Sequence, residues 1–248
     1  MFRCTSVLSL ALLCCAVVPA DQAGPVAAHP SKLQSQFLAS SLRFEADAHG
    51  YVARGPAYAL RVAADGASIN LGRGGIRMRL AGADNRVPGS LTGRLPGVSN
   101  YLTGNDPKAW RKGVPAYSQV RFENVYPGVS LVYYGNQRLL EYDFVVAPGA
   151  DPGQIRMDFE GAAGLRIDSA GDLLIAGSAG ELRQRLPVIY QGNGRERTPV
   201  EGRYVIERDR TVRFQIAGYD RGKPLTIDPV MVYSTYLGGS QDDGAFDV

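Results

Sequence analysis

The sequence predicts an all-β protein, folded as an antiparallel, two-sheet sandwich-like domain with little helix. From Leu42 onward, runs of four to eight residues rich in Val, Ile, Leu, Tyr and Phe alternate with clusters of Gly, Pro, Asp and Asn. The chain holds 30 glycines and 15 prolines, which suits many tight turns. Strands do not alternate with long helical periods, so a parallel α/β sheet is not expected.

The first twenty residues are typical of a signal peptide. Arg3 supplies a positive charge, an uncharged apolar run extends from Val7 to Val18, and Val18-Pro19-Ala20 is a small-residue cleavage pattern. This run of 12 residues is shorter than the roughly 20 needed to cross a bilayer as a helix. We therefore expect cleavage after Ala20 and an exported product that is periplasmic, extracellular or held at the cell surface.

All three cysteines, Cys4, Cys14 and Cys15, lie inside this segment. The mature chain would then have neither a disulfide nor a reactive thiolate. A lipoprotein signal at Cys14 or Cys15 is an alternative, although neither cysteine follows the small residue that such a signal requires. The formal charge of +3 is too small and too evenly spread to indicate a nucleic-acid partner.

Residues 21–41 are rich in Pro, Ala and Ser and are interpreted as a linker. The β-rich domain is expected over residues 42–228, with irregular chain between Leu80 and Ser118 and no internal repeat of 20 to 50 residues. The runs that favour strands, in chain order, are Leu42–Glu45, Gly50–Arg54, Tyr58–Val62, Ser68–Leu71, Ile76–Leu80, Ser118–Phe122, Val129–Tyr134, Leu139–Val146, Ile155–Glu160, Leu165–Ile167, Leu173–Ala176, Glu181–Arg183, Val188–Gln191, Arg203–Glu207, Val212–Ala217 and Leu225–Ile227.

The clearest local prediction is a hairpin in which Leu131–Tyr134 and Leu139–Val146 are joined by residues 135–138. Side chains alternate between the two faces of a strand. Glu141 and Asp143 therefore share one face of the second strand, and the other face is apolar, with Leu140, Tyr142, Phe144 and Val146.

Two further turns are expected. The segment Ile167–Leu173 predicts a second hairpin, in which Asp168 opens the turn and Gly171 supplies a positive φ. Gly72–Gly75 predicts a hairpin turn rather than a phosphate-binding loop, because no helix follows it.

The last segment, residues 229–248, predicts one strand and two turns. The strand from Val230 to Leu237 is apolar on both faces, and it meets a Gly238-Gly239-Ser240 turn and an acidic Asp242-Asp243-Gly244 turn. We expect this strand to lack partners within the chain and to be the least stable part of the fold, prone to self-association.

Several blocks follow one another in a recognisable order: Ser99–Arg111, Val114–Tyr117, Val125–Asn136, Leu140–Pro152, Arg185–Gln191 and Ile227–Pro229. Together they resemble the uncharacterised β-rich domain found directly before SBBP-type β-propeller repeats in bacterial exported proteins, over roughly residues 42–240. Residues 229–248 resemble the truncated first strand and turn of one such repeat. The chain departs from the family at Phe44–His49, where a longer Gln-rich segment is usual. The resemblance implies export, β-structure and a downstream propeller domain, and it implies no established reaction.

Glu141 and Asp143 are the nearest approach to a catalytic pair. Two carboxylates at positions i and i+2 of a strand stand on one face, about 7 Å apart. That spacing suits the acid and nucleophile of a glycosidase, or a site for a hard metal ion. The simpler interpretation, which we favour, is the solvent-facing side of an amphipathic strand, since strict alternation already explains both residues.

The best candidate ligand surface is a loop that contains Tyr101, Asn105, Asp106, Trp110 and Arg111. Aromatic, amide and carboxylate groups together often furnish carbohydrate sites, with the ring stacked on a sugar face. The alternative, which we favour, is that Asn105 and Asp106 form a turn and that Trp110, the one tryptophan, fills the core beneath it.

No cofactor or metal site is predicted. His29 and His49 lie 20 residues apart without cysteine partners, and the Asp242-Asp243 turn has too few oxygens for Ca²⁺. Without a Gly-x-Ser-x-Gly elbow, a cysteine or a usable histidine, a nucleophilic triad is not expected.

The sequence therefore predicts a non-enzymatic, exported or cell-surface β-domain that precedes a propeller and serves adhesion, scaffolding or the recognition of a carbohydrate or protein ligand. The alternative is a carbohydrate-active enzyme that uses Glu141 and Asp143. A concave pocket holding both carboxylates and Trp110 would favour the enzyme, whereas an open sheet would disfavour it. Neither a nucleic-acid partner nor a membrane span is expected.

Overall fold

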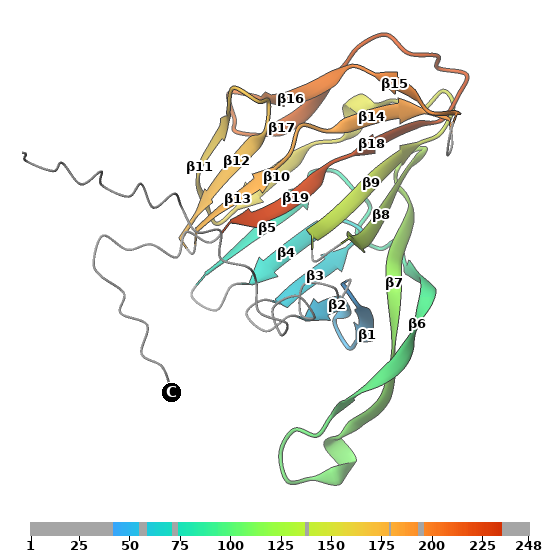
Figure 1. The fold of residues 1–248 in the computed structure, drawn as a ribbon, viewed down its shortest axis with the longest axis vertical. Helices are drawn as coiled ribbons and strands as arrows, with labels where there is room; N and C mark the ends of the chain where they lie inside the picture. Colours follow the sequence, from blue (N-terminus) through green and yellow to red (C-terminus); the bar gives the residue numbers. More distant parts are fainter. Residues whose placement is uncertain are drawn as a thin grey trace, which may run out of the picture.

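The computed structural model describes residues 42–54, 59–70, 74–136, 139–178, 180–192 and 196–234. The regular structure of these residues is antiparallel β-strand with two short 3₁₀ helices (Figure 1). The elements, in chain order, are β1 Phe44–Asp47, β2 Gly50–Arg54, β3 Ala59–Ala63, β4 Gly66–Asn70, β5 Gly75–Leu80, β6 Gly89–Tyr101, η1 Pro107–Ala109, β7 Arg111–Tyr126, β8 Val129–Asn136, β9 Leu139–Val146, η2 Pro152–Gln154, β10 Met157–Glu160, β11 Ala162–Ile167, β12 Leu173–Gly177, β13 Gly180–Gln184, β14 Val188–Gln191, β15 Thr198–Val200, β16 Gly202–Ile206, β17 Val212–Ile216, β18 Leu225–Asp228 and β19 Val230–Ser234.

The strands form one nearly closed, barrel-like sheet. On one side, β1 to β5 pair in succession, β5 pairs with β10, and β10 pairs with β17 and through it with β16. On the other side, β1 pairs with β7, and the ladder continues through β8, β9, β18, β14 and β15. The chain passes from β15 to β16 through Glu201, whose carbonyl accepts a hydrogen bond from the Ala217 amide at 2.8 Å.

The predicted two-sheet sandwich is therefore wrong, although the all-β, antiparallel class is confirmed. In a sandwich the strands divide into two sheets, whereas here β1 and β10 each pair on both sides and carry the ladder around the core. Alternation of apolar and polar residues reports one buried face per strand. This alternation is the same in a sandwich and in a barrel-like sheet, so it cannot distinguish the two architectures.

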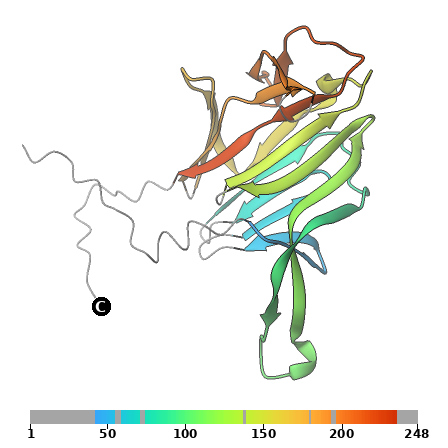
Figure 2. The ribbon, with the colours of Figure 1, turned by 45° about the vertical axis from the view of Figure 1, so that its right-hand side comes forward.

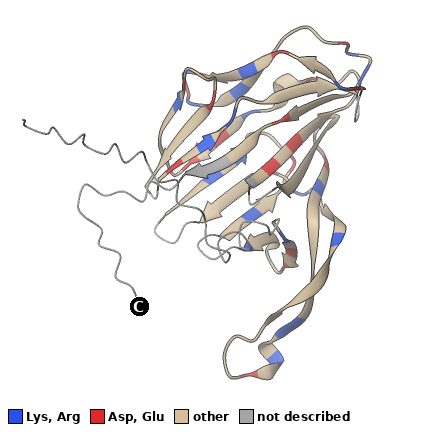
Figure 3. Ribbon diagram, viewed as in Figure 1, with Lys and Arg blue, Asp and Glu red and all other residues tan. Residues whose placement is uncertain are grey.

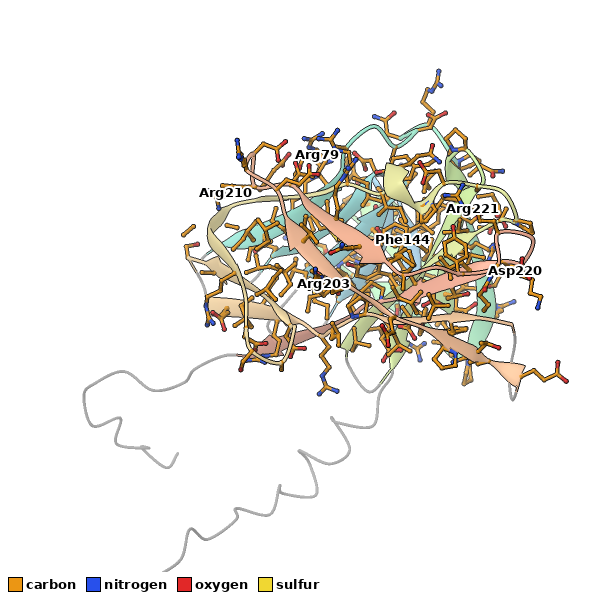
Figure 4. The ribbon with its side chains drawn as sticks, turned by 90° about the horizontal axis from the view of Figure 1, so that it is seen from above. Arg79, Phe144, Arg203, Arg210, Asp220 and Arg221 are labelled. Atoms are coloured by element: carbon orange, nitrogen blue, oxygen red, sulfur yellow. The ribbon has the colours of Figure 1, made fainter. Side chains whose placement is uncertain are left out.

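The inside of the sheet is filled by large side chains. Phe144 lies within the ring of strands when it is seen from above, with Arg79, Arg210 and Arg221 toward the rim (Figure 4). A row of edge-on and tilted aromatic rings crosses the core with centroids 5.5–6.1 Å apart, formed by Tyr51, Phe122, Tyr133, Tyr142, Phe144, Phe214 and Tyr204. Each such pair stabilises the fold by roughly 0.5–1.5 kcal/mol beyond the contribution from the buried area of its rings.

A long two-stranded arm, β6 with β7, projects from this body (Figures 1 and 2). The prediction of irregular chain between Leu80 and Ser118 is wrong here. Gly93 and Gly97 take positive φ values of 66° and 80°, and the register shifts between Arg94 and Val98. These bulges interrupt the period-2 pattern, and most of β6 is exposed, so neither of its faces needs apolar residues.

The predicted hairpins are confirmed. β8 pairs with β9, and β8 extends to Asn136, two residues into the predicted turn. Leu140, Tyr142, Phe144 and Val146 are buried while Glu141 and Asp143 face outward. At the β11–β12 turn the Asp168 carboxylate accepts from the Ala170 and Asp172 amides, and Gly171 has a φ of 86°. Asn70 of β4 pairs with Gly75 of β5, while residues 71–73 of the predicted turn at Gly72–Gly75 lie outside the described residues.

The expectation that the strand after Pro229 lacks partners is wrong for its first part. β19 lies between β9, which it meets at Val230 and Met231, and β13, which it meets from Met231 to Ser234. From Val230 to Ser234, the backbone therefore belongs to a strand inside the sheet rather than to an unpaired edge. The proposed turns beyond it, the signal peptide and the linker lie outside the described residues. No helix within the described ranges is long and apolar enough to cross a membrane.

Candidate functional site

The β6–β7 arm is fixed to the body by a buried acid that contacts the last residues of β6, just before the far end of the arm. Glu45, on β1, is 5% exposed and accepts hydrogen bonds from the Ser99 and Tyr101 hydroxyls of β6. Arg54 of β2 lies 4.0 Å from the same carboxylate. A charge in this position is tolerated because hydrogen bonds and a cation offset the loss of its hydration. The arm therefore projects from a rigid mount rather than from a loose hinge.

Tyr101 and Arg111, two of the predicted ligand residues, belong to this mount. The guanidinium carbons of Arg54 and Arg111 lie 5.3 and 5.5 Å from the centroid of the Tyr101 ring. Arg111 also donates from Nη2 to the Ala46 carbonyl at 2.8 Å. Burial raises the pKa of Tyr101, and its hydrogen bond to Glu45 adds to this. Both side chains are engaged within the protein.

A neighbouring acid on β1 completes the network that holds the arm. Asp47 accepts two hydrogen bonds from Arg61, at 2.8 and 3.0 Å, and lies 3.4 Å from Arg54. The bidentate contact with Arg61 lowers the pKa of Asp47 to about 2. Two acids and two arginines thus hold β1, β2 and β3 together beneath the arm.

The other predicted ligand residues lie at the far end of the arm, which we call the arm tip, residues 102–110. The Asp106 carboxylate caps the short helix η1 by accepting from the Lys108 amide at 2.9 Å. Trp110 donates from its indole nitrogen to the Gly104 carbonyl at 3.1 Å, and the Lys112 ammonium lies 4.8 Å from its ring centroid. The turn at Asn105 and Asp106 is confirmed. Trp110 is half-buried at the tip and not in the core, which corrects the favoured interpretation.

The arm is rich in positive charge (Figure 3). Four cations, Arg94, Lys108, Arg111 and Lys112, lie between residues 94 and 112, against the single acid Asp106. None of the four forms an ion pair with any of the described residues.

The predicted carboxylate pair on β9 is part of a larger acidic cluster on the outer face of the sheet (Figure 3). Tyr134 on β8 is paired with Glu141 on β9. β18 pairs with β9, with Ile227 opposite Phe144. β19 also pairs with β9, with Val230 opposite Glu141. That register places Asp228 opposite Asp143. The Tyr134 hydroxyl lies 2.9 Å from Asp143 Oδ1, to which it donates, and 3.4 Å from Asp228 Oδ1.

Two carboxylates facing each other across neighbouring strands repel when both are ionised. Burial raises the pKa of Asp143 to about 7, and the charge of Asp228 adds to this. Burial also raises the pKa of Asp228. The pair therefore retains a proton near neutral pH, as coupled acids do.

Arg197 and Tyr190 border the cluster. The Arg197 guanidinium carbon lies 4.0 Å from the centroid of the Tyr190 ring. Its charge lowers the pKa of both aspartates, against the larger effect of burial. Sequence reasoning found Glu141 and Asp143 by their spacing but missed Asp228, Tyr134 and Arg197. Asp228 and Arg197 are distant along the chain from β9, and Tyr134 reaches Asp143 from the neighbouring strand of the hairpin.

The structure does not bring Trp110 to the carboxylates. The aromatic ring lies at the arm tip, while Glu141 and Asp143 lie on β9 in the body (Figures 1 and 3). Within the described part of the chain, no group of three or more His, Cys, Asp or Glu side chains is arranged to hold a metal ion.

A family model described as a domain of unknown function, DUF7948, matches residues 40–230, which is most of the chain. The chain belongs to the DUF7948 family. The matched range begins just before β1 and ends at the first residue of β19, so the DUF7948 domain contains both the arm and the acidic cluster. No curated protein and no solved structure matches the chain.

Proposed function

We propose that this DUF7948 domain is a non-enzymatic, exported recognition domain that precedes a β-propeller and uses its β6–β7 arm to contact a ligand at the cell surface. The observation that carries the proposal is the mounting of the arm. A buried Glu45 and two guanidinium–aromatic contacts hold the ends of the two strands beside the tip, while the tip stays exposed. Rigid presentation of an exposed loop reduces the ordering cost of binding.

Export is the part of the proposal that rests on the first twenty residues. When the full chain is produced in a Gram-negative host, mass spectrometry is expected to find a mature form that begins near Asp21 in the periplasmic or secreted fraction. An intact form that starts at Met1 and stays in the cytoplasm would contradict export.

Recognition is tested with the mature chain on an array of immobilised bacterial polysaccharides and anionic lipids. We expect retention that is lost when residues 102–110 are replaced by a short Gly-Ser turn, because this change leaves the Glu45 mount in place. Retention that does not depend on the tip would place recognition elsewhere on the body and overturn the proposed role of the arm.

The second candidate function is a carbohydrate-active enzyme. The observation in its favour is the Asp143–Asp228 pair, which holds a proton near neutral pH as a general acid must. Hydrolysis of aryl glycosides that Asp143→Asn abolishes in a folded protein would establish the enzyme and contradict the recognition proposal. We expect no hydrolysis, because Trp110 and the carboxylates lie in different parts of the molecule.

A further inference from the structure

Most of the polar groups expected to bind a sugar are engaged within the protein itself. Tyr101 donates to Glu45, Arg111 donates to Ala46, and the Asp106 carboxylate caps η1. The Trp110 indole nitrogen donates to the Gly104 carbonyl. A site for a neutral sugar needs free, convergent donors and acceptors. At the arm tip, the Asp106 carboxylate and the Trp110 indole nitrogen are instead engaged internally.

What the tip offers outward is apolar surface flanked by cations. Leu102 is 57% exposed, Val98 on the adjoining strand is 49% exposed, and Trp110 is half-buried. Lys108 and Lys112 are exposed beside them. Aromatic and aliphatic groups next to lysines are the combination that settles at the boundary between lipid headgroups and acyl chains, where the ring and the ammonium groups both find partners.

We propose that the arm tip docks onto an anionic lipid surface, an inference that rests on the proposed role of the arm as the recognition element. Four cations against one acid between residues 94 and 112 give the arm an excess of three positive charges. A negative bilayer surface attracts such a segment. The strands of the arm carry the tip beyond the body, so contact with a flat surface does not require the barrel-like sheet to approach it (Figure 2).

The size of the tip argues against a folded protein as the partner. Stable protein–protein interfaces use roughly 20–30 residues on each side. The tip comprises nine residues, 102–110. A lipid surface sets no such requirement, since a few apolar side chains suffice when cations hold the segment at the headgroups.

The single tryptophan allows a direct test on the mature chain without a label. The probe is a vesicle of phosphatidylglycerol and phosphatidylcholine in equal amounts, with phosphatidylcholine alone for comparison. On the mixed vesicles we expect a blue shift of Trp110 emission and co-sedimentation of the protein. Both should weaken as salt is raised, because surface charges are screened.

Two variants in or beside the tip and one matched control sharpen the test. The double variant K108E/K112E is expected to weaken vesicle binding by about tenfold or more, because it reverses two charges at the headgroups. Leu102→Ser removes an exposed side chain and should reduce the blue shift severalfold. R208E/R221E makes the same charge change at exposed positions in the body and should bind like the parent protein. Far-UV circular dichroism checks that all three variants fold.

Three results would overturn the lipid assignment. The first is a Trp110 emission that does not shift when mixed vesicles are added. The second is a loss of vesicle binding in R208E/R221E that equals the loss in K108E/K112E. The third is tip-dependent binding to a soluble acidic polysaccharide by a protein that does not bind vesicles. The last result would keep the recognition role of the arm and replace only its partner, so the inference and the proposed function fail separately.

Discussion

Asp143 and Asp228 face each other across β9 and β18 with the Tyr134 hydroxyl against both. Such a pair is destabilising when fully ionised and is tolerated because it keeps a proton. The folded-state pKa of Asp143, about 7, lies above the ordinary value of 3.8. The folded protein therefore binds more protons than the unfolded chain between about pH 4 and pH 7, and its stability falls as pH rises through that window.

Asp143→Asn is expected to remove this pH-dependent cost. The variant should be more stable than the parent protein at pH 8.5, by roughly 1–4 kcal/mol, since each unit of pKa shift corresponds to about 1.4 kcal/mol. Near pH 4 the two proteins should differ little, because the parent carboxyl is then protonated in the folded state. Urea unfolding at the two pH values measures the difference.

Asp47→Asn is the matched control with the opposite sign. In the parent protein, Arg61 lowers the pKa of Asp47 to about 2. The ionised Asp47 carboxylate therefore stabilises the fold above about pH 4, and this contribution is lost as pH falls toward 2. At pH 8.5 this substitution should destabilise the protein. A loss of stability in both variants at pH 8.5 would show that the Asp143 carboxylate is not held at a raised pKa.

The turn between β3 and β4 depends on a glycine. Gly66 has a φ of 135°, and a Cβ added there would lie 1.9 Å from the Met78 carbonyl oxygen of β5. Gly66→Ala is expected to destabilise the protein by about 3 kcal/mol or more, because both the backbone and the neighbouring strand must move. Gly82→Ala, at a φ of 81° with open space around it, should cost only about 1 kcal/mol. Equal thermal unfolding midpoints for the Gly66→Ala and Gly82→Ala variants would contradict this account.

At the scale of elements, β19 joins two parts of the sheet. It pairs with β9 on one side and with β13 on the other, and Met231 is 5% exposed. Without β19, the β11–β12–β13 ladder would lose its backbone hydrogen bonds to the rest of the sheet, and β13 would become an open edge.

Two truncations test the place of β19. A chain that ends at Ser234 retains every described strand and is expected to unfold with the midpoint of the full chain. A chain that ends at Asp228 should be clearly destabilised and prone to aggregation. Hydrogen exchange should be slow at the β19 amides in the full chain. If the chain that ends at Asp228 were the more soluble and equally stable protein, β19 would not be an integral strand.

At the scale of the whole molecule, the ring of strands and the arm differ in their packing. The ring encloses one continuous core that extends from Leu42 to Met231, whereas the arm tip contributes no residue to that core. The body should therefore unfold as one cooperative unit, and the tip should open at lower cost.

Trp110 reports on the tip alone. In guanidinium chloride, far-UV circular dichroism is expected to show a single transition from the body, and Trp110 emission should change at a lower denaturant concentration. Coincident transitions would show that arm and body form one cooperative unit. In the Asp143→Asn variant the circular dichroism transition should shift at pH 8.5, while the Trp110 transition should not.

The sequence by itself determined what depends on neighbouring residues. It predicted the β class, the β8–β9 and β11–β12 hairpins, the turn at Asp106, and the common face of Glu141 and Asp143, because turn chemistry and the two-residue period of a strand are local properties.

Only the tertiary structure decided how the strands close on one another. It made a barrel-like sheet of a predicted sandwich, placed β19 between two strands, and set Asp228 opposite Asp143 although the two residues are distant in sequence. It also fixed the arm to Glu45 and left Trp110 at the tip. Strand register and sheet closure arise from contacts between segments far apart in the chain, and a local period contains no information about which segments will meet.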